Sequence, residues 1–227
     1  MSDFVSRSYN MELHHVLNRG VDKRSIFLDN QDRARFVHNL FEFNDKKQAQ
    51  NTSRHVNDLR SRSSISTSRL VQLHGWCVMG NHYHLLLSEI PEGGLTTFIR
   101  KLNIGYAKYF NEKYKRSGTL FQGRTKKVLV NRNAHFLHIL HYIHLNPLDF
   151  LAGAKHWREG HIDSRKKALA HLTQYRWSSY LDYCGEKNFP SILTKDIFAD
   201  VFPNYKKAVH SYIQEIEMEA LGELILE

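Results

Sequence analysis

Two histidines one residue apart, His82 and His84, are the side chains of this sequence best placed to do chemistry together. The apolar stretches around them predict a β-strand, in which residues i and i+2 point to the same face of a sheet. Two imidazoles that project side by side supply half of the ligands of a metal site. The chain has 15 histidines, so a pair at this spacing also arises without a function. A second signal downstream favours the metal interpretation.

That second signal is a tyrosine and an asparagine four residues apart, Tyr142 and Asn146, in an apolar segment. The spacing places the phenol and the carboxamide on one face of a helix. If this face packs against the strand of the histidines, two nitrogens and one amide oxygen surround a cation beside a phenol. Such ligands with open positions suit Mg²⁺ or Mn²⁺ in contact with a phosphate. His138 shares the face and is an open alternative or auxiliary ligand, whereas His144 points away from Asn146.

The elements that must position these residues alternate between strands and helices. Strands are predicted at residues 12–18, 70–79, 82–89 and 120–130, and helices at 30–44, 95–114 and 131–146. The order β-α-ββ-α-β-α predicts an α+β fold with a ferredoxin-like antiparallel sheet and helices on one face. The histidine pair opens the third strand, which forms a hairpin with the second.

Residues with strong local preferences mark the ends of these elements. The candidate helix caps are Asp29 or Asn30 for the first helix and Asn131 or Asn133 for the third. Gly80-Asn81 suits a tight turn between the second and third strands, and Pro147 ends the third helix.

The predicted sheet and helices occupy residues 1–150, which we expect to form one domain. Residues 45–69 inside it are polar and too poor in apolar side chains to form a layer, so they are predicted to be a mobile insertion. Residues 151–227 form a mainly helical C-terminal extension, with helices near 195–201 and 205–226 and a structural Trp177. The end of the chain is acidic and is expected to pack on the body or on a partner rather than on phosphates.

Basic residues dominate one segment of the chain. The sequence has 32 Lys and Arg against 23 Asp and Glu, and its formal net charge of +9 favours a polyanionic partner. Residues 100–132 carry ten Lys and Arg against one acid, Glu112, so this segment supplies the whole excess. Proteins that bind single-stranded nucleic acid use cations interleaved with aromatic rings, the cations for the phosphates and some of the rings for base stacking. The predicted DNA contacts are Arg124, Lys126, Lys127, Arg100 and Lys108.

Other properties of the sequence narrow the class of protein. Residues 1–10 have no apolar signal region, and no apolar run approaches the roughly 18 residues of a membrane span. Cys77 and Cys184 lie far apart, which argues against a disulfide framework or a thiolate zinc site. We therefore expect a soluble, cytoplasmic protein with reduced cysteines and no contact with a membrane.

Several motifs resemble one family. Residues 81–86, Asn-His-Tyr-His-Leu-Leu, resemble the His-hydrophobic-His signature of HUH single-strand nucleases. Residues 142–147, Tyr-Ile-His-Leu-Asn-Pro, resemble the tyrosine helix of the REP-associated tyrosine transposases, relatives of the single-tyrosine transposases of the smallest insertion sequences. Further segments that resemble the family lie, in the same order along the chain, at residues 15–20, 26–27, 109–111, 118–124 and 177–180. The resemblance thus covers most of residues 12–180.

This resemblance implies a site and a reaction. His82, His84 and Asn146 would hold a divalent metal, Mg²⁺ or Mn²⁺, and Tyr142 would attack single-stranded, hairpin-forming DNA. The products would be a 5′-phosphotyrosine and a free 3′-OH, and the strand could then be transferred without a nucleotide cofactor. A phenol with a pKa of about 10 is mostly protonated at neutral pH, but it is held in place and can retain the cleaved strand. The resemblance favours a monomer, with a dimer that exchanges the tyrosine helix as the alternative.

Three features depart from the family pattern. Gly80 stands where the family more often has Pro or Asp, the insertion at 45–69 is long, and Tyr83 is a polar aromatic between the histidines. They affect loop geometry and the DNA target and remove no catalytic group.

Two other functions are open to this sequence. One is a protein that binds hairpin DNA or RNA on the same fold without cutting it, against which the complete set of four site residues argues. The other is a hydrolase that uses a metal-bound water, for which an Asp- or Glu-rich ligand set is missing.

Overall fold

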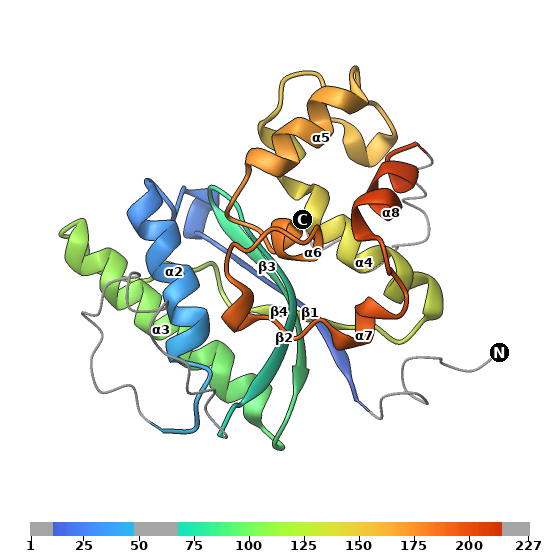
Figure 1. The fold of residues 1–227 in the computed structure, drawn as a ribbon. Coiled ribbons are helices and arrows are strands. Elements are labelled where there is room, and N and C mark those ends of the chain that lie inside the picture. Colours follow the sequence, from blue (N-terminus) through green and yellow to red (C-terminus); the bar gives the residue numbers. More distant parts are fainter. Residues whose placement is uncertain (1–10, 48–67, 215–227) are drawn as a thin grey trace.

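A four-stranded antiparallel sheet forms the centre of the protein (Figure 1). The computed structural model describes residues 11–47 and 68–214. The strands are β1 (Leu13–Arg19), β2 (Val71–Val78), β3 (His82–Glu89) and β4 (Lys126–Leu129), in the order β2-β3-β1-β4. All three neighbouring pairs are antiparallel. The predicted α+β fold with a ferredoxin-like antiparallel sheet is therefore confirmed.

Two long helices cover one face of this sheet. They are α2 (Asn30–Glu42) and α3 (Gly94–Lys113), and Figure 1 shows them side by side. Phe36 of α2 and Phe98 of α3 are fully buried in one apolar core with Tyr83 and Leu85 of β3. Because side chains alternate along a strand, the residues between these, His82 and His84, lie on the opposite face.

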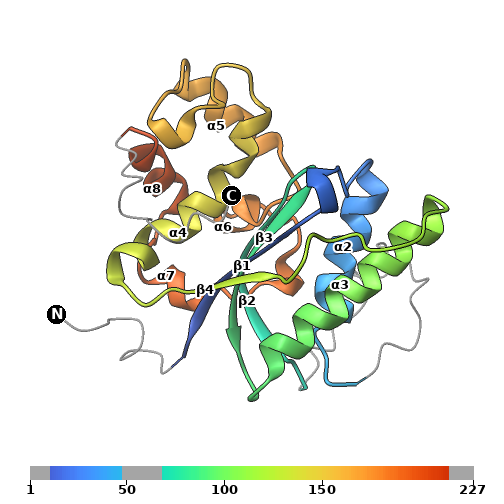
Figure 2. The same cartoon turned by 180° about the vertical axis from the view of Figure 1, so that it is seen from behind.

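The opposite face is covered by α4 (Asn133–Leu145) and the C-terminal extension, as both views show (Figures 1 and 2). The extension contains α5 (Arg165–Gln174), α6 (Tyr180–Tyr183), α7 (Asp196–Ala199) and α8 (Tyr205–Tyr212). Short 3-10 helices lie at Val21–Lys23, Asn146–Phe150, Trp157–Glu159 and Pro190–Ile192. Tyr142 and Ile139 of α4 share an apolar core with Trp157 and Tyr205. This second helical layer adds to the one that the sequence predicted, and the division of the chain at residue 150 stays a prediction.

The ends of the elements follow local chemistry in part. Asp29 caps α2 by accepting a hydrogen bond from the Asp32 backbone, as predicted. The prediction that Asn131 or Asn133 caps α4 is wrong, because Arg132 holds the cap position without a side-chain bond and Asn133 is already helical. The backbone of Val130 is still bonded to Leu13, so the chain is extended up to this point.

Strand β4 is shorter than the predicted 120–130. Gly123 has a φ of +63°, a left-handed conformation that interrupts an extended chain, and the strand begins only at Lys126. The segment around Trp177 lies along the β2 edge, since the Val78 N–H donates to the Trp177 carbonyl. Trp177 is buried and its indole N–H donates to Asn30, which confirms its structural role.

Parts of two predicted segments lie outside the described residues. They are residues 48–67 of the insertion and residues 215–227 of the last helix, whose described part, α8, ends at Tyr212. The predicted helix near 195–201 is present as α7. No helix in the described part of the chain is both long and apolar enough to cross a membrane.

Candidate functional site on the histidine face

The two histidines of the sequence motif lie together at the start of β3. His82 and His84 have ring centroids 4.9 Å apart and point to the side of the sheet that α4 covers, where His84 meets Tyr142; we call this side the histidine face. Tyr83 between them points the other way, and its hydroxyl donates to Asn103 of α3. The polar aromatic at this position is thus explained by a partner in the other layer, and it leaves the histidine pair undisturbed.

Helix α4 places its tyrosine directly on this pair. The Tyr142 ring centroid lies 5.7 Å from that of His84, in an edge-on arrangement. Tyr142 is fully buried, and Trp157 from the extension packs on its other side at 5.9 Å. The structure therefore brings together His82, His84 and Tyr142, which lie some 60 residues apart in the sequence, within one chain.

A third histidine, His15 of β1, completes the cluster. Its Nε2 lies 2.9 Å from Nδ1 of His84, and its ring stacks on His84 and meets Tyr142 edge-on at 5.8 Å. The sequence reasoning placed His15 in a family-like segment but gave it no role. The signal that could have identified it is the alternation of Leu13, His15 and Leu17, because antiparallel pairing sets Leu17 opposite His84 and makes His15 a diagonal neighbour.

Asn81 in the hairpin turn holds the other histidine. Its Oδ1 lies 2.6 Å from Nδ1 of His82, and its Nδ2 donates to the Lys23 carbonyl at 3.0 Å. The Gly20 N–H in turn donates to the Asn81 carbonyl. The turn is therefore fixed to the segment that follows β1, and His82 is fixed to the turn.

Asn146, the proposed third ligand, lies at the end of α4 beside Tyr142 but is engaged elsewhere. Its Nδ2 donates to the Tyr142 carbonyl at 2.9 Å, and its Oδ1 accepts a hydrogen bond from Arg158. Arg158 also pairs with Asp149 at 2.7 Å, and its guanidinium lies 5.7 Å from the Tyr142 ring centroid. The Asn146 oxygen is therefore already bonded to a guanidinium, whose positive charge disfavours a cation at the same atom.

The remaining histidines of α4 belong to the packing of the extension. His138 lies against Tyr212 of α8 with ring centroids 5.4 Å apart, so it faces a helix rather than the histidine pair. His144 is bonded through both nitrogens, to the Tyr205 hydroxyl and to Ser179, each at 2.7 Å. Burial lowers its pKa well below the ordinary value. His144 thus points away from the site, as predicted.

Within residues 11–47 and 68–214, no group of three or more His, Cys, Asp or Glu side chains converges to hold a metal ion. The site offers two imidazoles and, once released, one amide oxygen. These donors fit a cation that takes its other ligands from phosphate and water.

One protein-family model matches a segment of this chain. Residues 37–146 match a family model described as "Transposase IS200 like". The match spans 110 of the 227 residues, so this part of the chain is similar to the IS200-like transposase family. The segment contains His82, His84, Tyr142 and Asn146, whereas β1 with His15 precedes it.

Similarity to individual proteins is weaker than similarity to this transposase family. One solved structure, titled "Structure of the REP associates tyrosine transposase bound to a REP hairpin", is 12% identical. It covers 81% of this chain and 85% of its own, with a TM-score of 0.49. No curated protein matches the sequence.

The predicted DNA-contacting residues divide between the two faces of the sheet. Lys126 pairs with Leu17, which pairs with His84, so the register puts Lys126 in the same row as His84 on the histidine face. Arg124 precedes it at the surface, and Lys127 alternates to the other face. Arg100 and Lys108 are exposed on α3, across the sheet from the histidine pair.

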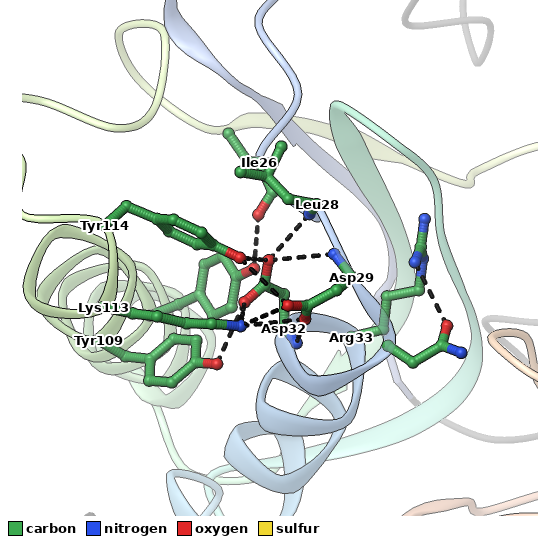
Figure 3. Close-up of polar contacts among 10 residues, drawn as sticks. Ile26, Leu28, Asp29, Asp32, Arg33, Tyr109, Lys113 and Tyr114 are labelled. Atoms are coloured by element: carbon green, nitrogen blue, oxygen red, sulfur yellow. Dashed lines mark hydrogen bonds and ion pairs between the residues drawn. The ribbon is translucent and has the colours of Figure 1, made fainter.

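A second buried polar cluster lies on the face that α2 and α3 cover, and we call it the aspartate clamp (Figure 3). Asp32, fully buried near the start of α2, accepts hydrogen bonds from the Leu28 backbone, Lys113 and Tyr114 at 2.7–2.8 Å. Burial lowers the pKa of Lys113, but hydrogen bonds to Asp29 and Asp32 outweigh it and raise that pKa overall. The clamp joins the beginning of α2 to the end of α3.

Proposed function

We propose that this protein cuts and rejoins single-stranded, hairpin-forming DNA through a covalent bond to Tyr142. The observation that carries the proposal is the ring contact between Tyr142 and His84 within one chain, with centroids 5.7 Å apart. A phosphate held at these histidines would lie beside the phenol.

His82 and His84, with Asn146, are the residues that would hold a divalent cation, Mg²⁺ or Mn²⁺. Both imidazoles have Nδ1 in a hydrogen bond, as is typical of histidines that bind metals through Nε2. When bound, such a cation supplies Lewis-acid polarisation of a phosphate oxygen. Asn146 is the weaker donor, because its oxygen is bonded to Arg158.

Tyr142 would supply the nucleophile. Its phenolic oxygen forms a bond to phosphorus, the bond from phosphorus to the 3′ oxygen breaks, and that oxygen takes up a proton as the phenol loses one. The phosphodiester energy stays in the 5′-phosphotyrosine, so a second 3′-OH can reverse the step on another strand. No nucleotide cofactor is needed for either half.

The same-chain contact supports a monomer that acts on DNA with its own tyrosine. Because Tyr142 and His84 are fully buried and only His82 reaches the surface, at 7% exposure, the site must open before a strand can enter. The segment with Trp157 and Arg158 covers Tyr142 and is the part whose displacement would expose it.

Basic residues beside the site would carry the incoming strand. Lys126 lies in the row of His84, and Arg124 and Lys127 are its exposed neighbours. Their cations are suited to the phosphates of single-stranded DNA.

The test is a gel-based assay of covalent adducts with a labelled single-stranded hairpin substrate and Mn²⁺. Tyr142→Phe should bind the DNA with unchanged affinity and form no adduct that survives denaturation. Tyr180→Phe is the matched control, because this buried tyrosine lies in the same apolar core and should leave adduct formation intact. An undiminished adduct with Tyr142→Phe overturns the assignment. Cleaved DNA without any protein linkage would instead favour a hydrolase.

A further inference from the structure

The two histidines of the site share one feature: each has Nδ1 hydrogen-bonded to a side chain outside the proposed set of metal ligands. His84 is bonded to His15 and His82 to Asn81. We propose that His15 and Asn81 are positioning residues, which hold the two imidazoles in the orientation and tautomer that present both Nε2 atoms to a divalent cation. The inference rests on the proposed function for the identity of that ligand.

For His82 the geometry determines which nitrogen carries the proton. Asn81 donates through Nδ2 to the Lys23 carbonyl, which can only accept, so the amide oxygen is the atom that faces His82. That oxygen also only accepts. The proton of the neutral imidazole is therefore on Nδ1, and the lone pair is on Nε2.

For His84 the partner is itself an imidazole, so either ring could donate. Binding of a cation through Nε2 requires the proton of His84 on Nδ1, which then donates to Nε2 of His15 at 2.9 Å. His15 is fully buried in β1, between β3 and β4, so its ring is held by the sheet. The stacked geometry, with 15° between the ring planes, keeps the two imidazoles in register.

Two buried histidines outside the site, His74 and His144, are bonded differently. His74 of β2 is also fully buried, but it is bonded through both nitrogens, to Ser88 at 2.8 Å and to the Thr194 carbonyl at 3.0 Å. His144 likewise has both nitrogens in bonds to side chains. His74 and His144 thus use both ring nitrogens for bonds within the packing, whereas the bonds of His82 to Asn81 and of His84 to His15 both engage Nδ1.

The experiment measures Mn²⁺ affinity of the full chain, by calorimetry and by electron paramagnetic resonance, in variants of the two positioning residues. Asn81→Ala and His15→Leu should each weaken Mn²⁺ binding about 10- to 100-fold. His15→Gln and Asn81→Asp keep an acceptor at the same place and should restore most of the affinity. His74→Gln is the matched control and should bind Mn²⁺ as the wild type does. Asn81 lies half-buried in a turn, so its variant should fold even if His15→Leu does not.

A second readout needs no metal. Long-range ¹⁵N–¹H spectra of the metal-free protein should show His82 with its proton on Nδ1, and Asn81→Ala should convert it to a mixture of tautomers. Unchanged affinity together with an unchanged tautomer in Asn81→Ala overturns the inference. If the wild type binds no Mn²⁺ but the tautomer responds to Asn81→Ala, positioning stands and the metal of the proposed function fails. A mixed tautomer in the wild type contradicts the inference whatever the metal does.

Discussion

The histidine face and the aspartate clamp are two buried polar clusters on opposite sides of one sheet, and they are built on opposite principles. In the clamp, Lys113 meets the fully buried Asp32 and the exposed Asp29, so charges of opposite sign neutralise each other at the edge of the core. On the histidine face, the imidazoles of His15, His82 and His84 gather beside the phenol of Tyr142. Burial of ionisable groups is common to both clusters. A set of like groups beside a reactive phenol is what distinguishes the one suited to an incoming cation and phosphate.

The difference also predicts what each cluster contributes to the protein. The clamp ties the start of α2 to the end of α3 through short, charge-assisted hydrogen bonds, so its loss should appear in stability. Substitutions on the histidine face should instead reduce metal binding and DNA chemistry, with little effect on the free energy of unfolding.

The largest expected effect on folding comes from Asp32→Ala. The substitution leaves Lys113 with part of its partners missing and removes the acceptor of the Leu28 N–H and of Tyr114. We expect the free energy of unfolding, measured with urea, to fall by about 3–5 kcal/mol, while the folded fraction keeps its Mn²⁺ affinity. Asp22→Asn, in an exposed ion pair with Arg24, is the control and should change it by less than about 0.5 kcal/mol. A variant as stable as the wild type would remove the contrast between the clusters.

The next largest effect is a pH dependence that originates where α4 meets α8. Burial against the aromatic rings of Phe202, Tyr205 and Tyr212 lowers the pKa of His141 from its ordinary value of about 6.5 to about 4. Because the unfolded chain binds this proton more readily, the contribution of the neutral His141 to stability is fully present above about pH 6.5. It is lost as the pH falls towards 4. The loss is on the order of 3 kcal/mol for this histidine.

The variant His141→Phe should therefore flatten the stability curve between pH 6.5 and 4 relative to the wild type, in urea melts at each pH. His210 lies at an exposed position of α8, the helix that packs against His141, and His210→Gln should leave the curve unchanged. Equal slopes for His141→Phe and the wild type would show that burial of this imidazole does not matter for stability.

A smaller effect concerns the basic residues on the two sides of the sheet. Replacing Arg124, Lys126 and Lys127 together by Gln should weaken binding of a single-stranded oligonucleotide and reduce the slope of log affinity against log salt by about 2. Arg100→Gln with Lys108→Gln tests whether the strand also reaches α3, where we expect a reduction of about 1. If only the α3 pair changes the slope, the DNA lies on the face of the clamp and the proposed path is wrong.

The smallest expected effect is that of Tyr142→Phe on stability. The change removes one hydroxyl from a buried ring that stays packed between His84 and Trp157. The free energy of unfolding should fall by no more than about 1.5 kcal/mol, well below the effect of Asp32→Ala. A loss of stability as large as that of Asp32→Ala would show that the Tyr142 hydroxyl has mainly a structural role.

Local patterns in the sequence predicted the elements that carry the site. The strand at His82–Glu89, the Asp29 cap of α2 and the α+β order all follow from alternation, capping and turn chemistry of neighbouring residues. The same patterns put His82 and His84 on one face of β3 and Tyr142 with Asn146 at one end of α4.

Contacts between distant segments decided what the sequence did not predict. His15 joins the site only through the pairing of β1 with β3. Asn146 is bonded to Arg158, which lies in the 3-10 helix Trp157–Glu159. The cap of α4 was predicted wrongly because the pairing of Val130 with Leu13 keeps the preceding chain extended. The clamp was not predicted, because Asp32 and Lys113 are 81 residues apart.

The most direct test of the central claim is to map the covalent adduct by peptide mass spectrometry. The full chain is incubated with a single-stranded hairpin oligonucleotide and Mn²⁺, denatured, and digested with nuclease and protease. Our account predicts a nucleotide remnant linked through its 5′ phosphate to the peptide that contains Tyr142, specifically to that side chain, and a released fragment with a 3′-OH. An adduct on any other residue, or cleaved DNA with no linked peptide, would contradict it.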